Sequence, residues 1–216
     1  MIKLQKNLSK IVIIFILCVF SQVKLAKAET AGVDECMKKI VFQYDNYTGL
    51  TPSEKTKYIG LIKQVCQQQM GFIDVKSQNY YEYPRTMVVT DFVEDFINES
   101  TTKTSKINKT LYLVYNNDRT VYVEGWVVKQ ALNLDSELII HETIHTFHGG
   151  DWSGATDMLD EGLTEYQAQK IMPKPLYAYI CPQEAVKSVI NALERIDPTM
   201  DGYRELSLSY MKGNQR

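Results

Sequence analysis

The chain has 216 residues, of which 44% are hydrophobic, and it carries a formal net charge of −2. This length suits one domain, or two lobes that share one core. The charge balance is slightly acidic, which gives no reason to expect nucleic acid as a partner.

Residues 1–28 have the pattern of a secretory signal peptide. Three lysines precede the apolar run 11–20, which is too short to span a bilayer comfortably, and Ala26-Lys27-Ala28 is an A-x-A cleavage site. A retained membrane anchor is the alternative, and the cleavage site argues against it. We therefore expect a secreted protein, cleaved after Ala28 and without stable membrane association. Cleavage would remove five basic residues and no acidic ones, which leaves a net charge of −7.

Residues 29–100 are expected to form a mainly helical N-terminal region. The spacing of apolar residues predicts helices over 31–45 and 51–70. The second opens on the capping box Thr51-Pro52-Ser53-Glu54. Over residues 87–97 the pattern does not decide between a short helix and a strand.

Three cysteines follow the predicted cleavage site: Cys36, Cys66 and Cys181. Secretion permits disulfides, and Cys36 and Cys66 lie on the two neighbouring predicted helices, which makes them the favoured pair. Three buried free thiols fit the sequence about equally well. None of the three has zinc-finger spacing, and an odd number cannot pair completely within one chain.

After the polar loop 98–109 the hydrophobic period changes to two. Residues 111–115 and 120–123 are rich in β-branched and aromatic side chains, and residues 116–119 separate them as a turn. The sequence therefore predicts a β-hairpin.

Three helices are predicted in the last third of the chain, with prolines between them. They run over residues 155–172, from Pro182 to about Ile196, and from Asp201 or Gly202 to Lys212. Helices followed by strands and then by helices indicate an α+β fold.

Between the hairpin and these helices lies His141-Glu142-Thr143-Ile144-His145, an H-E-x-x-H motif on a predicted helix. Residues four apart share one face of a helix, so His141 and His145 can bind one metal ion. Glu142, beside the first histidine, would take a proton from a metal-bound water. All three histidines of the chain fall within residues 141–148, which argues against an accidental match.

A catalytic zinc site needs a third protein ligand and keeps a fourth position for water. Two candidates follow the motif: a carboxylate within Asp160-Glu161-Gly162-Leu163-Thr164-Glu165-Tyr166 in the next predicted helix, and Asp151 just beyond the H-E-x-x-H helix. His148, near the end of that helix, is a weaker candidate than either.

The motif, followed 16 residues later by Glu-Gly-Leu-Thr-Glu-Tyr, resembles the gluzincin (peptidase MA-like) zinc metallopeptidases over about residues 136–170. The resemblance implies that Glu161 is the third ligand of one zinc ion. It also implies that Glu165, one turn later, hydrogen-bonds the first histidine. The expected fold is a minimal gluzincin: a small β-hairpin or sheet packed on the H-E-x-x-H helix, with a helical C-terminal lobe. Residues 101–216 would then be the catalytic region.

A metzincin-like site, H-E-x-x-H-x-x-G-x-x-H or -D, is the alternative. Asp151 stands at the right distance, but His148 occupies the glycine position and Gly149 comes one place late. That glycine permits the turn which brings the third ligand back. We therefore favour Glu161 over Asp151.

Ser209-Tyr210-Met211-Lys212-Gly213 resembles the Tyr-Glu-Lys-Gly segment of zinc aminopeptidases, whose tyrosine donates a hydrogen bond to the substrate carbonyl oxygen. By this resemblance Tyr210 faces the metal across a cleft. Tyr203, on the same helix face, is the alternative donor, and simple core packing of Tyr210 is a third possibility.

The sequence thus predicts a secreted zinc metallopeptidase that acts on peptides or proteins, with Glu142 as general base and Tyr210 as donor. The alternative is a secreted binding or adhesion protein that retains this fold without turnover. A structural zinc site has no use for an adjacent glutamate, which favours the enzyme. Neither the substrate nor a preference for endo- or exopeptidase cleavage follows from the residues.

Overall fold

The computed structural model of the protein describes eight segments of the chain. These are residues 32–44, 49–72, 85–90, 113–116, 120–134, 136–147, 157–173 and 180–212. The predicted signal peptide, the polar loop 98–109 and the candidate ligands His148 and Asp151 lie outside the described residues.

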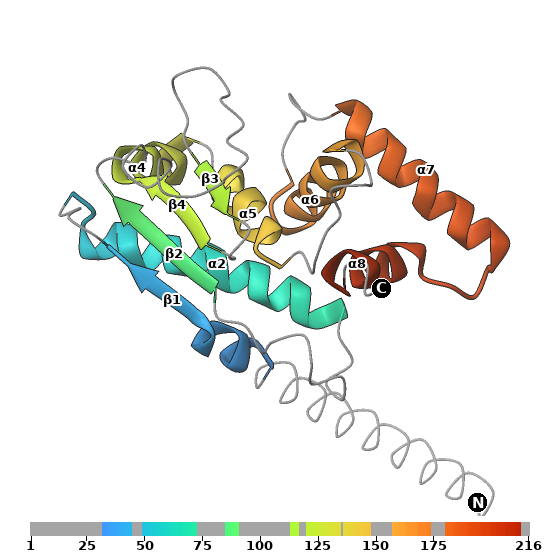
Figure 1. The fold of residues 1–216 in the computed structure, drawn as a ribbon, viewed down its shortest axis with the longest axis horizontal. Helices are drawn as coiled ribbons and strands as arrows, with labels where there is room; N and C mark the ends of the chain where they lie inside the picture. The colour runs from blue at the N-terminus through green and yellow to red at the C-terminus, as the bar shows by residue number, and fades with distance from the viewer. Residues whose placement is uncertain are drawn as a thin grey trace, which may run out of the picture.

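A four-stranded sheet in the order β1-β2-β4-β3 forms one layer of the molecule (Figure 1). The strands β1 (Ile40–Gln43), β2 (Arg85–Thr90) and β4 (Thr120–Glu124) run parallel to one another. β3 (Leu113–Asn116) pairs antiparallel with β4, which confirms the predicted hairpin. The sheet therefore joins strands from both sides of residue 100.

The N-terminal region departs from the prediction at its first helix. Residues 32–38 are helical, but residues 40–43, which were included in that helix, form β1. Ile-Val-Phe is a run of strand-favouring side chains, and parallel pairing with β2 supplies the hydrogen bonds that a continued helix would have supplied. The undecided segment beginning at residue 87 lies in a strand as far as Thr90.

α2 (Pro52–Phe72) connects β1 to the parallel strand β2, as a parallel pair requires. Its predicted capping box is present: the Glu54 carboxylate accepts from the Thr51 N–H at 2.7 Å, and the Thr51 hydroxyl accepts from the Glu54 N–H at 3.2 Å. The helix continues two residues beyond its predicted end at residue 70.

Cys36 and Cys66 form a disulfide that fastens the helix at 32–38 to α2. Both cysteines are fully buried, whereas Cys181 is exposed and free. The predicted pair is confirmed, and three free thiols are excluded. Closing a loop of this length stabilises a fold by about 3–4 kcal/mol in the chain-entropy account.

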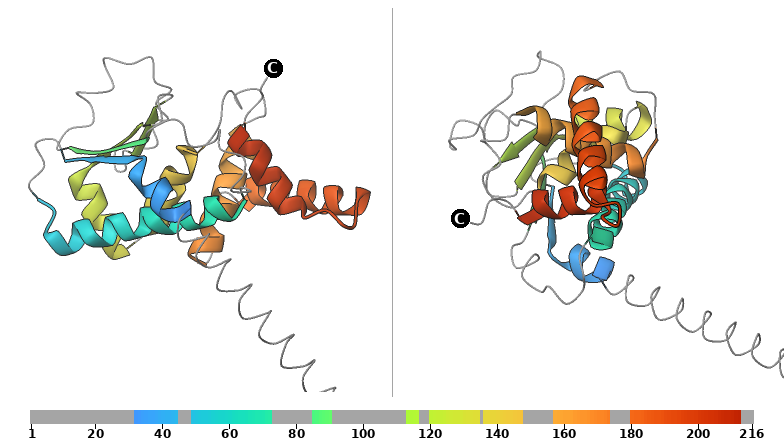
Figure 2. Two further views of the ribbon diagram at one scale, coloured as in Figure 1. Left: turned by 90° about the horizontal axis from the view of Figure 1, so that it is seen from below. Right: turned by 90° about the vertical axis from the view of Figure 1, so that its right-hand side faces the viewer.

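Five helices follow the sheet strands along the chain. They are α4 (Gly125–Leu134), α5 (Ser136–His145), α6 (Asp157–Ile171), α7 (Ile180–Ile196) and α8 (Gly202–Lys212). The last three match the three helices predicted there. α2 and α4 cover one face of the sheet, and α6, α7 and α8 gather at the end of the molecule away from it (Figures 1 and 2). The arrangement is α+β.

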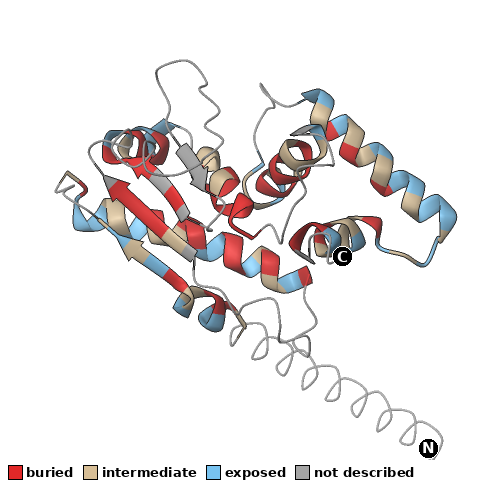
Figure 3. Ribbon diagram, viewed as in Figure 1, coloured by how far each residue is buried: buried red, intermediate tan, exposed pale blue. Residues whose placement is uncertain are grey.

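α5 lies in the middle of this assembly, in contact with α2, α4, α6 and β3. Figure 3 shows that buried residues concentrate where α2 and the sheet meet α5. Ile140 and Ile144 of α5 are fully buried, as are Ile62 and Val65 of α2. The helix that carries the H-E-x-x-H motif is thus part of the hydrophobic core. Among the described helices, none has the length and apolar character that a membrane span requires.

Candidate metal centre

The core fixes the direction in which α5 presents its histidines. Apolar residues at positions 139, 140 and 144 bury the helix, and His141 and His145 are themselves buried on the side that meets α6. The helix ends at His145, and the next two residues, Thr146 and Phe147, donate backbone hydrogen bonds to the carbonyls three residues earlier. The two imidazoles therefore project from successive turns toward one neighbour.

α6 is held against the rest of the C-terminal lobe by a close helix contact at Gly162. A Cβ atom on this residue would lie 2.4 Å from the carbonyl oxygen of Pro182 in α7, so no larger residue fits without displacing a backbone. The glycine of the Glu-Gly motif thus allows α7 to pack closely against α6. Glu161, its neighbour, comes from the first turns of α6 and meets α5.

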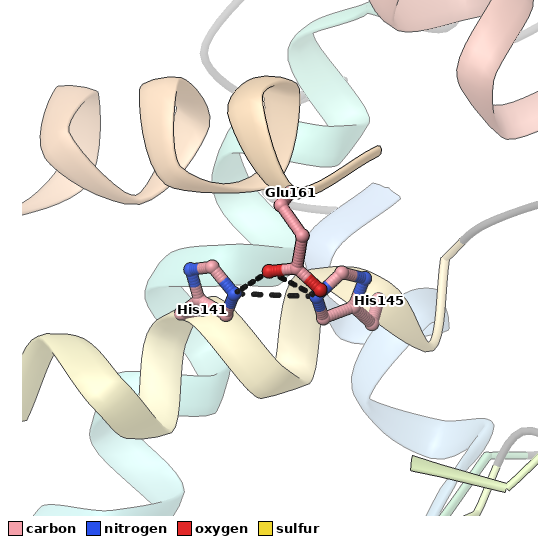
Figure 4. A group of neighbouring side chains, drawn as sticks. All are labelled: His141, His145 and Glu161. Carbon is pink, nitrogen blue, oxygen red and sulfur yellow. Dashed lines mark hydrogen bonds and ion pairs between the residues drawn. The ribbon is translucent and has the colours of Figure 1, made fainter. Parts of the chain in front are cut away.

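Three ligand atoms converge between α5 and α6 (Figure 4). The Nε2 atoms of His141 and His145 are 3.2 Å apart, and Glu161 Oε2 lies 3.1 Å from the first and 3.7 Å from the second. Ligands on a tetrahedral zinc ion with bonds of about 2.0–2.2 Å lie about 3.3–3.6 Å from one another. The cluster therefore fits a zinc ion in both donor chemistry and spacing, and this group of three is the one found among the described residues.

The outer nitrogen of His141 also has the partner that the resemblance implies. Glu165 Oε2 lies 2.9 Å from His141 Nδ1, and the Glu165 side chain is largely buried. A metal-binding histidine needs such an acceptor, because the acceptor fixes the tautomer and the direction of the ring. Glu161 and Glu165, one turn apart on α6, thus contact the two nitrogens of one imidazole.

The outer nitrogen of His145 meets a set of groups that sequence reasoning did not assign. Asp160 Oδ1 and the Tyr210 hydroxyl each lie 3.3 Å from His145 Nδ1, and Thr164 Oγ1 lies 3.4 Å from it. Asp160 and Thr164 are four residues apart, as are Glu161 and Glu165, so α6 presents two adjacent pairs to the two histidines. That double spacing was a signal in the sequence.

Tyr210 of α8 lies beside a candidate ligand. Its side chain is fully buried, and its hydroxyl lies on the Nδ1 side of His145, whereas the candidate ligand atom is Nε2. The hydroxyl thus contacts a candidate ligand directly, and its role as a donor to the substrate stays a prediction. The alternative donor, Tyr203, contacts other residues. Its hydroxyl accepts from Gln68 Nε2 at 3.2 Å, and its ring packs against Phe72. A helix pattern marks Tyr210 as inward-facing but does not determine which element its hydroxyl meets.

The carboxylates around the histidines favour the protonated, cationic form of both rings. Burial alone would lower the pKa of His141, but Glu161 and Glu165 outweigh it and raise this pKa to about 9. For His145, burial is outweighed by Asp160 and Glu161, which raise the pKa to about 10. Burial would raise the pKa of Glu161, yet the two histidines hold it well below its usual range. A site that attracts protons this strongly also attracts a divalent cation, which would displace them.

Glu142 sits beside the cluster as a half-buried side chain. Burial raises its pKa; the nearby His141 and His145 partly offset this effect, and the negative charges of Glu161 and Asp160 reinforce it. A carboxylate whose pKa lies above its ordinary value is a stronger proton acceptor, which suits a group that accepts and returns a proton.

The competing third ligand Asp151 lies outside the described residues. Among the described ones, Glu161 is the carboxylate that joins the two histidines in the group of three. Neither a protein-family model, nor a curated protein, nor a solved structure matches this chain.

Proposed function

We propose that this protein is a secreted zinc metallopeptidase with a minimal gluzincin-like catalytic region. The observation that carries the proposal is the convergence of His141 Nε2, His145 Nε2 and a Glu161 oxygen at the mutual spacing of zinc ligands. The residues are those of a motif that resembles the family, and they come from the two helices that the resemblance names.

The composition of the cluster favours a catalytic over a structural ion. Structural zinc sites close the metal with four protein ligands, whereas catalytic sites use three and keep one position open. Among the described residues three side chains form the group, and the Glu161 side chain is 34% exposed, so the cluster has a side open to solvent. The adjacent Glu142 supplies an acid–base group that a structural ion does not need.

A bound zinc ion would acidify a water molecule and polarise the scissile carbonyl. Glu142 would accept the proton of the attacking water and pass it to the leaving amine, for which its raised pKa is suited. Glu165 holds His141 by its outer nitrogen, so the ring stays oriented while the reaction proceeds.

The position of β3 supports a peptide as the substrate class. Among the described strands β3 is at the edge of the sheet, with β4 as its neighbour on one side, and it contacts the H-E-x-x-H helix. An extended peptide can add to such an edge by backbone hydrogen bonds, which would carry it past the metal cluster.

Secretion is supported by the disulfide between Cys36 and Cys66, because disulfides persist in oxidising compartments. It is also supported by the signal-peptide pattern of residues 1–28. We infer that the mature chain begins after Ala28.

The proposal is tested by purifying the mature chain and measuring zinc content and cleavage of a peptide library. The wild type should hold one zinc ion and cleave peptides. Glu142→Gln should keep fold and zinc but lose at least about 10²–10⁴ in rate, the usual contribution of a general base. A Glu142→Gln variant with wild-type activity would refute the mechanism, and a zinc-loaded wild type that cleaves no peptide would support the binding-protein alternative.

A further inference from the structure

The surroundings of His145 differ from those of His141. One carboxylate, Glu165, lies on the outer nitrogen of His141. At His145 three oxygen groups gather instead, two from α6 and one from α8. The Tyr210 hydroxyl lies 2.8 Å from Asp160 Oδ1 and 2.8 Å from Thr164 Oγ1, as well as 3.3 Å from His145 Nδ1.

Proton accounting assigns the direction of these hydrogen bonds in a metal-loaded site. A neutral imidazole that binds a metal through Nε2 carries its proton on Nδ1 and donates it. The Asp160 carboxylate and the Tyr210 oxygen can both accept that proton. Tyr210 in turn donates its own hydroxyl proton to Asp160 at 2.8 Å. In this arrangement His145 donates, Asp160 accepts, and Tyr210 does both, and each role fits the chemistry of its group.

Asp160 and Tyr210 differ in how far water reaches them. The Asp160 side chain is 28% exposed, so water competes for its oxygens, whereas Tyr210 is fully buried. A buried hydroxyl that donates to the carboxylate holds it in one rotamer against that competition. The phenol therefore orders Asp160, the other acceptor of the His145 proton.

The helix that carries Tyr210 is itself fixed by buried polar contacts. Ser207, three residues before Tyr210 on α8, accepts from Gln167 Nε2 at 3.0 Å. Gln167 accepts in turn from Gln69 Nε2 of α2 at 2.8 Å. All three of these residues are fully buried. The contacts set the position of α8 against α6 and α2, and so set where the Tyr210 hydroxyl lies.

We propose that Tyr210 is a positioning residue for the metal ligand His145, which it orients jointly with Asp160, so that docking of the last helix determines how tightly the site holds its metal. The inference rests on the proposed zinc function of the cluster. Tyr210 acts through His145 and does not touch the substrate.

The test compares Tyr210→Phe with the wild-type mature protein in zinc affinity, measured by competition with a chelator. Loss of an outer partner typically weakens metal affinity 10–100-fold, and we expect a loss in that range. Excess zinc should restore most of the lost turnover, because no donor to the substrate is lost. A donor to the substrate oxygen would instead cost about 10²–10³ in turnover with zinc affinity unchanged.

Tyr203→Phe is the matched control, since it removes another hydroxyl from α8 whose partners, Gln68 and Ser207, do not belong to the cluster. Its zinc affinity should equal that of the wild type. Cobalt-substituted protein adds a spectroscopic readout: Tyr210→Phe should alter the visible absorption of the bound ion, and Tyr203→Phe should not.

Asp160→Asn is the second variant and keeps the core phenol in place if Tyr210→Phe does not fold. It should weaken zinc binding too, and the double variant should lose less than the product of the two single losses, because the residues act on one nitrogen. Wild-type zinc affinity in Tyr210→Phe or Asp160→Asn would overturn the inference and leave the proposed function standing. A wild-type protein that binds no zinc would overturn both.

Discussion

Replacing Glu161 by alanine removes one of the three converging ligand atoms and should release the zinc ion. The loss should exceed the 10–100-fold that removal of an outer partner typically costs, because a direct ligand is lost. Asp151→Ala, which removes the rival third ligand, should leave zinc affinity unchanged. Comparing the two variants therefore decides whether Glu161 or Asp151 is the third ligand.

The loss of zinc affinity in Glu161→Ala can be measured as a smaller rise of the Tm on adding zinc. At a free zinc concentration 100 times the dissociation constant, binding stabilises the folded wild type by about 2.7 kcal/mol. The chain without residues 1–28 has 188 residues, and for a domain of this size that energy raises the Tm by about 5–10 °C. A 100-fold weaker Glu161→Ala variant gains only about 0.4 kcal/mol at the same zinc concentration, a shift of about 1–2 °C.

The assay is a melting curve of each metal-free protein with and without zinc, alongside metal content after dialysis. Wild type and Asp151→Ala should both show the full shift, and Glu161→Ala almost none. The reasoning is refuted if Glu161→Ala keeps the full shift, and the ligand assignment passes to Asp151 if that variant alone loses it.

Three further predictions follow from the same contacts. Glu165→Ala should weaken zinc binding by about 10–100-fold in a chelator competition, and an unchanged affinity would make its contact with His141 incidental. Gly162→Ala should lower the free energy of unfolding by about 1–3 kcal/mol in urea titrations, since its methyl would lie 2.4 Å from the Pro182 oxygen, and wild-type stability would contradict that crowding. In the metal-free protein the raised pKa values of His141 and His145 add stability that is complete below about pH 6.5 and is lost as the pH rises through 9 to 10, so its Tm should fall over that window. The zinc-loaded protein, whose histidines are neutral ligands, should not show that fall, and a metal-free Tm that stays constant would contradict the ion pairing.

The candidate site could be predicted from the sequence because its parts are local. His141 and His145 are one helical turn apart, and so are Glu161 and Glu165, so each pair shares a face whatever the rest of the chain does. The two helices then need only pack antiparallel for His141 to meet Glu165 and for His145 to meet Asp160, as they do. The cysteine pair was found for a similar reason, since it links neighbouring helices.

The features that sequence reasoning missed depend on distant contacts. Residues 40–43 were assigned to a helix because a short apolar run fits either period, and only pairing with residues 85–88 makes them a strand. The parallel pairing of β1 with β2, across the crossover through α2, and the parallel pairing of β2 with β4 leave no short-range pattern. The contact of Tyr210 with the outer nitrogen of His145 was not predicted, because it depends on how α8 docks on α6.

The most direct test of the central claim is zinc K-edge absorption spectroscopy of the purified mature protein. We expect one tightly held zinc ion bound by four nitrogen or oxygen atoms at about 2.0–2.1 Å, with the scattering of two imidazoles and no sulfur. Glu161→Ala should lose that signal after dialysis. A wild type that loses its zinc on dialysis, or a spectrum with a sulfur ligand or without the two imidazoles, would contradict a site built from His141, His145 and Glu161.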